Sequence, residues 1–373
     1  MKIGFDAKRA TQNFTGLGNY SRFIINNMVR YFPENTYELF SPRKVTDKLD
    51  NEIIKSKNID IFVKQTSKPF WRTMGITKDI QNEKIDIYHG LSNELPIGID
   101  QISAKSIVTI HDLIFLRYPE FYPLVDRKIY NAKACYACKV ADKIVAVSEC
   151  TKRDIIEFYN TDPNKIEVVY QGCSSIFKEI VDVETKLATI KKYTLPSKFI
   201  LSIGSIEDRK NILLIVKALK YLPDVHFVTI GKRRKYTEKV IKYAIENNLS
   251  DRVHILNDVP LNDLPAILQS SDVFIYPSKY EGFGIPIIEA LYSKVPVIAA
   301  IGSCLEEAGG PNSIYVNPYD EKHLAQEIKR LLADPQLREL MIREGYKYVT
   351  RFSDEACTRS LMKVYEDLYN SNK

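Results

Sequence analysis

Residues 273–290 read VFIYPSKYEGFGIPIIEA. The first four, 273–276, are β-branched or aromatic and predict a short buried strand. Gly282 and Gly284 then allow the backbone to turn tightly or to approach a ligand, because they carry no Cβ. Pro286 fits the first position of a helix, where its missing N–H would be unpaired in any case. The stretch therefore predicts a strand, a glycine-rich turn and a helix in succession. This βα unit is the one that repeats in parallel α/β sheets.

The same alternation continues in both directions along the chain. Apolar runs predict strands at Lys2–Phe5, Tyr37–Phe40, Ile59–Val63, Ile85–Tyr88, Ser106–Thr109, Lys143–Val147, Ile166–Val169, Phe199–Ile203, His226–Ile230, His254–Leu256, Val273–Tyr276, Val297–Ala300 and Ser313–Val316. Helical patterns lie at Asn19–Tyr31, Arg127–Ala141, Ile212–Leu222, Tyr236–Asn247, Asn262–Ser270, Pro286–Lys294, Glu321–Ala333 and Pro335–Thr350. Strands separated by helices in this way indicate βαβ units and parallel sheets.

The length of 373 residues suits two domains of about 150–200 residues each. A charged segment without a strand period ends in Leu195-Pro196-Ser197 and predicts a linker. We therefore expect a first domain at residues 1–183, a linker at 184–197 and a second domain at 198–354. Both are predicted to be doubly wound, Rossmann-like α/β domains that face each other across a cleft. Ligands of such sheets bind beyond the carboxyl ends of the strands.

Composition excludes several other classes of protein. The 53 Lys and Arg residues against 47 Asp and Glu residues give a net charge of +6, spread evenly along the chain. No basic tail stands out, so a nucleic-acid protein is not expected, whereas an anionic ligand or a membrane surface remains open. The sequence shows neither a signal-peptide-like stretch nor an apolar run of about 18 residues, and a cytoplasmic location is expected. The Cys135-x-x-Cys138 pair lacks the further ligands of a zinc site and is interpreted as helix interior.

Two glutamates flank the glycine turn of residues 282–284. Glu289 falls about one turn into the following helix, where its carboxylate could accept two hydrogen bonds from a vicinal diol such as that of ribose. Glu281 precedes the turn and could reach a second set of hydroxyls. The free N–H groups at the start of the helix and the helix dipole favour an anion beside them. Two solvated glutamates on an ordinary turn remain the alternative.

A second loop of the same domain carries cations. After the strand at 199–203, Arg209 and Lys210 could neutralise a diphosphate, the first as a planar fork and the second as a point charge. The basic residues 231–235 follow another strand and could line a nucleotide. A solvated, charged loop is the alternative in both places.

The first domain offers three weaker candidates. His111 ends the strand before it and could be a polar contact, a proton shuttle or a structural histidine. Gly16 and Gly18 open a helix and could let backbone N–H groups meet a substrate, although their spacing makes a poor dinucleotide fingerprint. The Phe70-Trp71-Arg72 segment could be an acceptor platform or core under a loop.

Together these motifs resemble the retaining GT-B glycosyltransferases of family 4, and most of all its bacterial mannosyltransferases. The similar segments cover nearly the whole chain and are Gly16–Arg22, His111-Asp112-Leu113 with Tyr118-Pro119-Glu120, Ala146–Thr151, Val168–Gly172, Ile203–Asn211 and Glu281-x7-Glu289. Two positions depart from the family. Gly204-Ser205 stands where many members have Gly-Arg, and Ser303–Glu307 reads SCLEE where SSLPE is common, which leaves the role of Glu307 open.

The resemblance implies transfer of a sugar from a nucleotide-sugar to a hydroxyl of a glycan or lipid-linked acceptor, with retention of the α configuration. It assigns the ribose diol to Glu289, the diphosphate to Arg209 and Lys210, and sugar hydroxyls to Glu281. The backbone N–H groups of residues 283–285 (Phe283, Gly284 and Ile285) would meet phosphate and sugar. His111 would contact the sugar, and residues 355–373 would form a helix that crosses back to the first domain. The nucleotide-sugar is a substrate, and neither a cofactor nor a metal is expected.

Donor and partners stay open at this point. GDP-mannose is the first choice and a UDP-sugar the second, and a nucleotide-sugar epimerase shares the architecture. A nicotinamide-dependent oxidoreductase would need an intact GxGxxG after the first strand. A two-domain sugar-binding protein would normally carry an export signal. Basic residues after Pro123 could bring the enzyme to the inner face of a membrane or could form a solvated helix face.

Overall fold

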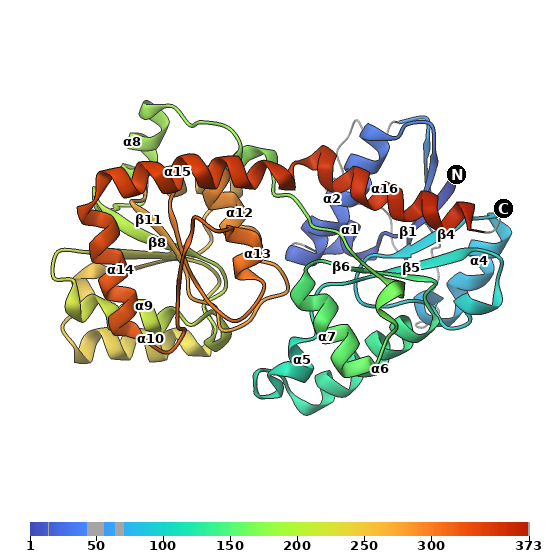
Figure 1. The fold of residues 1–373 in the computed structure, drawn as a ribbon, viewed down its shortest axis with the longest axis horizontal. Coiled ribbons are helices and arrows are strands. Elements are labelled where there is room, and N and C mark those ends of the chain that lie inside the picture. Colours follow the sequence, from blue (N-terminus) through green and yellow to red (C-terminus); the bar gives the residue numbers. More distant parts are fainter. Residues whose placement is uncertain (14, 43–55, 64–70, 372–373) are drawn as a thin grey trace. The chain divides into compact units, whose positions relative to one another are not determined.

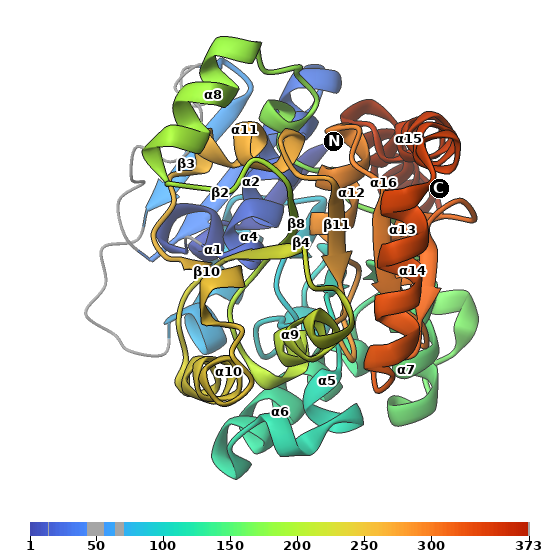
Figure 2. The same ribbon diagram turned by 90° about the vertical axis from the view of Figure 1, so that its left-hand side faces the viewer.

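The computed structural model describes residues 1–13, 15–42, 56–63 and 71–371 (Figure 1). The chain forms two compact units: Met1–Gly172 together with Ser353–Lys373, and Cys173–Phe352. The boundaries therefore lie before those expected from the sequence. Most of the expected linker at 184–197 is occupied by helix α8 (Val183–Lys192), which packs on α11 (Leu264–Gln269) of the second unit (Figure 2).

The first unit is built on a seven-stranded parallel sheet in the order β3-β2-β1-β4-β5-β6-β7. Its strands are β1 (Lys2–Asp6), β2 (Thr36–Ser41), β3 (Ile59–Val63), β4 (Ile87–Gly90), β5 (Lys105–Ile110), β6 (Lys143–Ala146) and β7 (Ile166–Val168). The strand order runs outward in opposite directions from β1 and β4. Open α/β sheets bind ligands beside such a reversal, at the carboxyl ends of the strands.

Helices cover both faces of this sheet, and each face has its own apolar core. The helices are α1 (Lys8–Gln12), α2 (Gly16–Tyr31), α4 (Ile76–Asn82), α5 (Ile114–Arg117), α6 (Leu124–Val140), α7 (Glu149–Tyr159) and α16 (Asp354–Asn370). Side chains of α1, α2 and α16 form one core with β1 and β4. Those of α4 to α7 form the other. Because the strands are buried on both faces, they read as continuous apolar runs rather than as alternating ones.

The second unit repeats the plan with six parallel strands in the order β10-β9-β8-β11-β12-β13. The strands are β8 (Phe199–Ile203), β9 (His226–Ile230), β10 (Val253–Leu256), β11 (Val273–Tyr276), β12 (Val297–Ala300) and β13 (Ile314–Val316). Its further helices are α9 (Ile212–Ala218), α10 (Lys235–Glu246), α11 (Leu264–Gln269), α12 (Ile285–Tyr292), α13 (Leu305–Gly309), α14 (Glu321–Ala333) and α15 (Pro335–Val349). Figure 1 shows α9, α10 and α14 on one side of this sheet and α12 on the other.

The chain returns to the first unit through α16, which packs beside α2 (Figure 1). Five of its residues belong to the first unit's core: Leu361, Met362, Val364, Tyr365 and Leu368.

A buried polar chain also holds this helix. The hydroxyl of Tyr365 lies 2.6 Å from Nδ1 of His89, whose Nε2 lies 2.8 Å from the hydroxyl of Thr109. Burial lowers the pKa of His89 to about 3, so the ring is neutral and bonds as a neutral donor and acceptor. This chain of contacts ties α16 to strands β4 and β5 of the first unit's sheet.

Across the part of the chain that the structure describes, no helix is both long enough and apolar enough to span a bilayer.

Candidate functional site

Two loops of the second unit meet at the carboxyl edge of its sheet. The short 3₁₀ turn Asp208–Lys210 follows β8, and Glu281 lies in the loop after β11. One carboxylate oxygen of Glu281 is 2.6 Å from Nη1 of Arg209, and the other is 2.7 Å from Nζ of Lys210. All three side chains are largely buried. The two ion pairs join the three residues that the sequence predicted into one charged cluster.

Tyr276 completes this cluster, although the sequence analysis did not single it out. Its hydroxyl accepts a hydrogen bond from Lys210 Nζ at 2.6 Å and donates to Glu281 at 3.3 Å. Arg209 also donates to the carbonyl of Tyr280 at 2.8 Å. The sequence could have indicated Tyr276 as a site residue. It is the last residue of a predicted parallel strand, and the carboxyl ends of such strands form the ligand-binding edge of the sheet.

Burial and pairing have opposite effects on these charges. Burial would raise the pKa of Glu281, but the Arg209 and Lys210 cations outweigh it and hold that pKa at about 2. Burial likewise opposes the charge of Arg209, yet Glu281 raises the pKa of Arg209 above its ordinary value. For Lys210 burial is the larger effect, and its pKa is lowered. A buried, paired carboxylate of this kind stays ionised at all physiological pH values and keeps two cations in fixed positions.

Backbone geometry brings the cationic turn against its neighbours. Asn211 has φ of 57°, and its amide donates to the carbonyls of Pro277 and Pro318 at 3.1 and 2.7 Å. A Cβ on Gly231 would lie 1.8 Å from the carbonyl oxygen of Gly204, so only glycine permits this close approach of the two loops. The turn is thus tied to three other loops at the same sheet edge.

The glycine turn before α12 also needs its glycine. Gly284 has φ of 119°, in the region that other residues rarely adopt, and a Cβ there would lie 3.1 Å from Leu305. The helix begins at Ile285, so Pro286 is its second residue rather than the first. Pro286 has no N–H, and the N–H of Ile287 donates to the carbonyl of Gly284 at 2.9 Å, so in this first turn the N–H of Ile285 remains to meet an anion. Phe283 is buried, and its ring contacts that of Phe352 at 5.4 Å.

Glu289 lies one turn into α12 and differs sharply from Glu281. Its side chain is half-buried, and it forms no hydrogen bond or ion pair with any residue that the structure describes. Desolvation without a compensating cation raises the pKa of Glu289 to about 7. A desolvated carboxyl group without a hydrogen-bond partner lowers the stability of the folded protein, and a ligand that donates hydrogen bonds to it would offset this cost.

The remaining basic loop of the second unit behaves differently. Residues 232–235 are all exposed. The Arg233 guanidinium reaches the backbone carbonyl of Ile255 at a long distance of 3.4 Å. These observations favour the solvated-loop interpretation.

The other candidates belong to the first unit. His111 is nearly buried, its Nε2 bonds the carbonyl of Leu91 at 2.9 Å, and the ring packs edge-on against Tyr20 at 4.6 Å. Burial lowers the pKa of His111 to about 4, and the ring is therefore neutral. Its Nε2 then carries the proton that is given to Leu91, which leaves Nδ1 as a hydrogen-bond acceptor.

Gly16 and Gly18 both lie in the first turn of α2, as expected, but they are not equivalent. A Cβ on Gly18 would lie 2.0 Å from the carbonyl oxygen of Asn13, whereas one on Gly16 would meet nothing within 4 Å. Gly18 is thus required for packing. Trp71 belongs to the core, where it donates to Asp79 at 2.6 Å, and Phe70 lies outside the described residues.

Known families match the chain in two segments. The model described as Glycosyltransferase Family 4 matches residues 25–174, and the model described as Glycosyl transferases group 1 matches residues 186–348. The two matches together cover most of the chain and fall in different structural units.

Individual relatives agree with these matches. The O-antigen chain mannosyltransferase B of Escherichia coli is 26% identical over 385 residues, which are 98% of this chain and 100% of that protein. The sucrose-phosphate synthase structure from Thermosynechococcus elongatus has a TM-score of 0.80 at 19% identity and covers 100% of both chains. Anabaena HepE in complex with UDP-glucose has a TM-score of 0.77 at 16% identity, over 98% of this chain and 100% of that chain. The fold is GT-B, and the chain belongs to glycosyltransferase family 4.

Proposed function

We propose that this enzyme transfers mannose from GDP-mannose to a hydroxyl of a glycan or lipid-linked acceptor in cell-surface polysaccharide synthesis, with retention of the α configuration. One observation carries the proposal. The same edge of the sheet holds two buried cations, Arg209 and Lys210, and also the carboxyl group of Glu289, which has no partner among the described residues. Arg209 and Lys210 supply fixed positive charge, and Glu289 lacks a donor that a ribose diol would provide.

In this proposal the diphosphate of the donor binds Arg209 and Lys210. The Lys210 ammonium has three N–H donors and donates two of them, to Tyr276 and Glu281. The third can donate to a phosphate oxygen. The N–H groups of Phe283, Gly284 and Ile285 add the helix N-terminus as a second positive end. Glu281 has two tasks, since it holds the cations in place and offers acceptor oxygens to sugar hydroxyls.

The chemistry is positioning and charge stabilisation. As the bond to the sugar breaks, negative charge grows on the leaving diphosphate, and preorganised cations stabilise it at no further cost of reorganisation. The leaving phosphate then accepts the proton of the acceptor hydroxyl on the same face of the sugar. His111 is neutral and can accept a hydrogen bond from the sugar through Nδ1, and Gly16, where a Cβ would meet nothing within 4 Å, leaves room for a ligand beside its backbone.

The choice of GDP-mannose rests on the mannosyltransferase name of the Escherichia coli relative. A UDP-sugar is the second candidate, because Anabaena HepE is described in complex with UDP-glucose. A nucleotide-sugar epimerase would use the same cluster without an acceptor.

A donor screen separates these possibilities. The purified protein is titrated calorimetrically with GDP and with UDP, and each nucleotide-sugar is then incubated with membrane extract as acceptor while release of its nucleoside diphosphate is followed. GDP release that depends on acceptor supports the proposal. Release of UDP alone would change the donor, and conversion of the free nucleotide-sugar to its epimer would replace the transferase reaction.

A lipid-linked acceptor would bring the enzyme to a membrane surface. The first turns of α6 support this part of the proposal, because Leu124 and Val125 are each 68% exposed and lie beside the basic residues Arg127 and Lys128. Co-sedimentation with anionic phospholipid vesicles, compared between the wild type and Leu124→Asp, tests it. Equal sedimentation of both proteins would remove α6 from membrane contact.

A further inference from the structure

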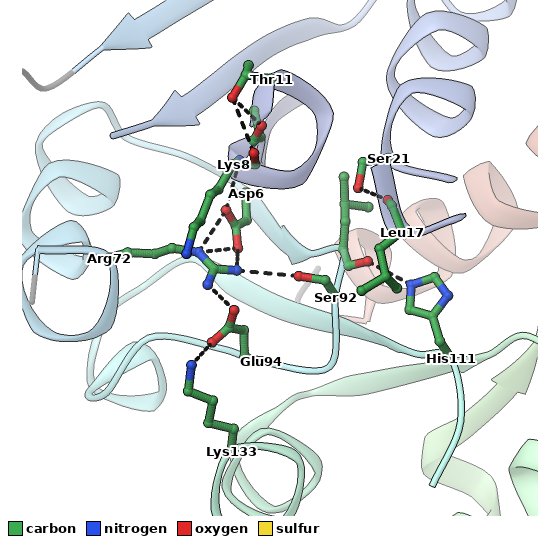
Figure 3. Close-up of polar contacts among 12 residues, drawn as sticks. Asp6, Lys8, Thr11, Leu17, Ser21, Arg72, Ser92, Glu94, His111 and Lys133 are labelled. Carbon is green, nitrogen blue, oxygen red and sulfur yellow. Dashed lines mark hydrogen bonds and ion pairs between the residues drawn. The ribbon is translucent and has the colours of Figure 1, made fainter. Parts of the chain in front are cut away.

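The charged clusters of the two units are carried by different kinds of backbone. In the first unit Asp6 is the last residue of β1, and it pairs with Arg72, which also pairs with Glu94 (Figure 3). In the second unit Glu281 lies in a loop, directly before the glycine turn of residues 282–284. Glycine allows a backbone many conformations. A fixed position for the Glu281 carboxylate therefore needs a restraint on this turn.

The thiol of Cys304 provides such a restraint. Cys304 lies in the loop between β12 and α13, and its side chain is fully buried. Its Sγ lies 2.9 Å from the carbonyl oxygen of Phe283 and 3.1 Å from that of Glu281. These two carbonyls stand on either side of Gly282. A single thiol donor thus holds the backbone before and after this glycine.

The backbone of Cys304 is itself held by helices. Its carbonyl accepts hydrogen bonds from the N–H groups of Glu307 and Ala308 in α13, at 3.1 and 3.2 Å. Helix α13 packs against the glycine turn, since a Cβ on Gly284 would lie 3.3 Å from the Cβ of Ala308. The hydroxyl of Tyr348 in α15 donates to the carbonyl of Glu307 at 2.8 Å. The thiol therefore connects the turn to two helices of the second unit.

Several features of the candidate site depend on the conformation of this turn. The Glu281 carboxylate reaches Arg209 and Lys210 from the residue just before it. The N–H of Ile285 opens α12 directly after it, and Glu289 lies one turn further along the same helix. A shift of the turn would move these groups together. Misplacement of reacting groups by about 1 Å can lower a rate on the order of 100-fold.

We propose that Cys304 is a positioning residue of this enzyme, whose thiol holds residues 281–283 so that the Glu281 carboxylate and the first N–H of α12 keep their places at the donor site. The inference rests on the proposed function in one respect, since Glu281 is taken to contact the sugar of the donor. A serine is common at position 304 in the family, and its hydroxyl can also donate to a carbonyl. Cys304→Ser should therefore preserve the restraint.

A thiol that only fills the core would behave differently. Truncation of a packed, buried side chain lowers the melting temperature, because it leaves a cavity and loses contacts. At temperatures where the variant is fully folded, such a loss leaves turnover unchanged. Loss of a positioning residue lowers turnover in the folded protein as well.

Three variants separate these roles. Cys304→Ala removes the donor, and Cys304→Ser restores one at the same position. Val240→Ala is the matched control, because Val240 of α10 is fully buried in the core of the same unit. The full chain of each variant is compared with the wild type in thermal melting and in amide hydrogen exchange of peptides spanning residues 279–290. Calorimetric titration with the nucleoside diphosphate and acceptor-dependent turnover of the nucleotide-sugar complete the comparison.

In Cys304→Ala we expect turnover to fall about tenfold or more at a temperature where the protein is folded. Affinity for the nucleoside diphosphate should fall less, because the hydroxyl of Tyr276 and the carbonyl of Tyr280 also hold the cations of the site. Exchange in residues 279–290 should become faster. Cys304→Ser should recover most of the turnover and of the protection from exchange. Val240→Ala should melt at a lower temperature, with wild-type turnover and wild-type exchange in this peptide.

Wild-type turnover or wild-type exchange of the turn in folded Cys304→Ala would overturn the proposal. An equal loss of turnover in Val240→Ala would also overturn it. If Cys304→Ala does not fold, Cys304→Val takes its place, since valine fills the same position without a donor. A wild-type protein that turns over no nucleotide-sugar would instead refute the proposed function, and hydrogen exchange of residues 279–290 still judges Cys304 in that case.

Discussion

Glu289 predicts a measurable exchange of protons when the donor nucleotide binds. Its carboxyl has a pKa of about 7 in the free protein because it is desolvated without a partner. A ribose diol donates hydrogen bonds and therefore prefers the ionised form, so binding lowers this pKa and releases a proton. With a free pKa of about 7, roughly nine molecules in ten are ionised at pH 8 and roughly one in ten at pH 6. Affinity should thus fall about tenfold from pH 8 to pH 6.

Calorimetry with an intact nucleotide-sugar, in buffers of different ionisation enthalpy, measures this proton directly. The intact donor is preferred because its diphosphate has no group that titrates in this range. Glu289→Gln should bind more weakly at pH 8, by about tenfold, and should release no proton. Wild-type binding that is independent of pH and releases no proton would refute the ribose role of Glu289.

Three other outcomes follow from the described contacts. Arg209→Ala and Lys210→Ala should each weaken binding of a nucleoside diphosphate about tenfold and that of the monophosphate less, by calorimetry; equal losses would point to folding damage or to base contact. Gly18→Ala should lower the free energy of unfolding by about 1–3 kcal/mol in a urea titration because its Cβ would strike the Asn13 carbonyl, while Gly16→Ala should not; equal effects would contradict this packing. His111→Ala should lower turnover more than nucleotide affinity, and wild-type turnover in a folded variant would make His111 structural.

The alternation of strands and helices was readable from the sequence. Parallel strands covered on both faces are continuous apolar runs, so segments such as Phe199–Ile203 and Val273–Tyr276 have the bounds that the sequence predicts. The segment at 184–197 was predicted to be a linker, and most of it forms helix α8. Helix α8 buries only Thr189 along its length, and a helix that packs so lightly has little apolar stripe to recognise.

The sequence predicted individual residues of the candidate site, but it did not predict which of their side chains contact one another. Glu281 and Lys210 are 71 positions apart, and no local pattern records that their side chains pair. The contrast between the two glutamates was also hidden, because the pKa of each depends on neighbours from other loops. The sequence also did not predict that Asp6, Arg72 and Glu94 pair in the first unit, since they come from three distant segments.

The return of α16 to the first unit has a consequence for biosynthesis. Cys173–Phe352 is continuous in the chain, so this unit can close its core as soon as it leaves the ribosome, whereas the first unit must wait for Leu361, Tyr365 and Leu368. At about 5–20 residues per second, translation of the roughly 200 residues in between takes about 10–40 s. During that interval the apolar surface on which α16 packs is exposed on the nascent first unit. We expect chaperones to bind this surface until α16 covers it. A nonsense codon shortly before residue 353 would accordingly spare the second unit and leave the first without its last core helix.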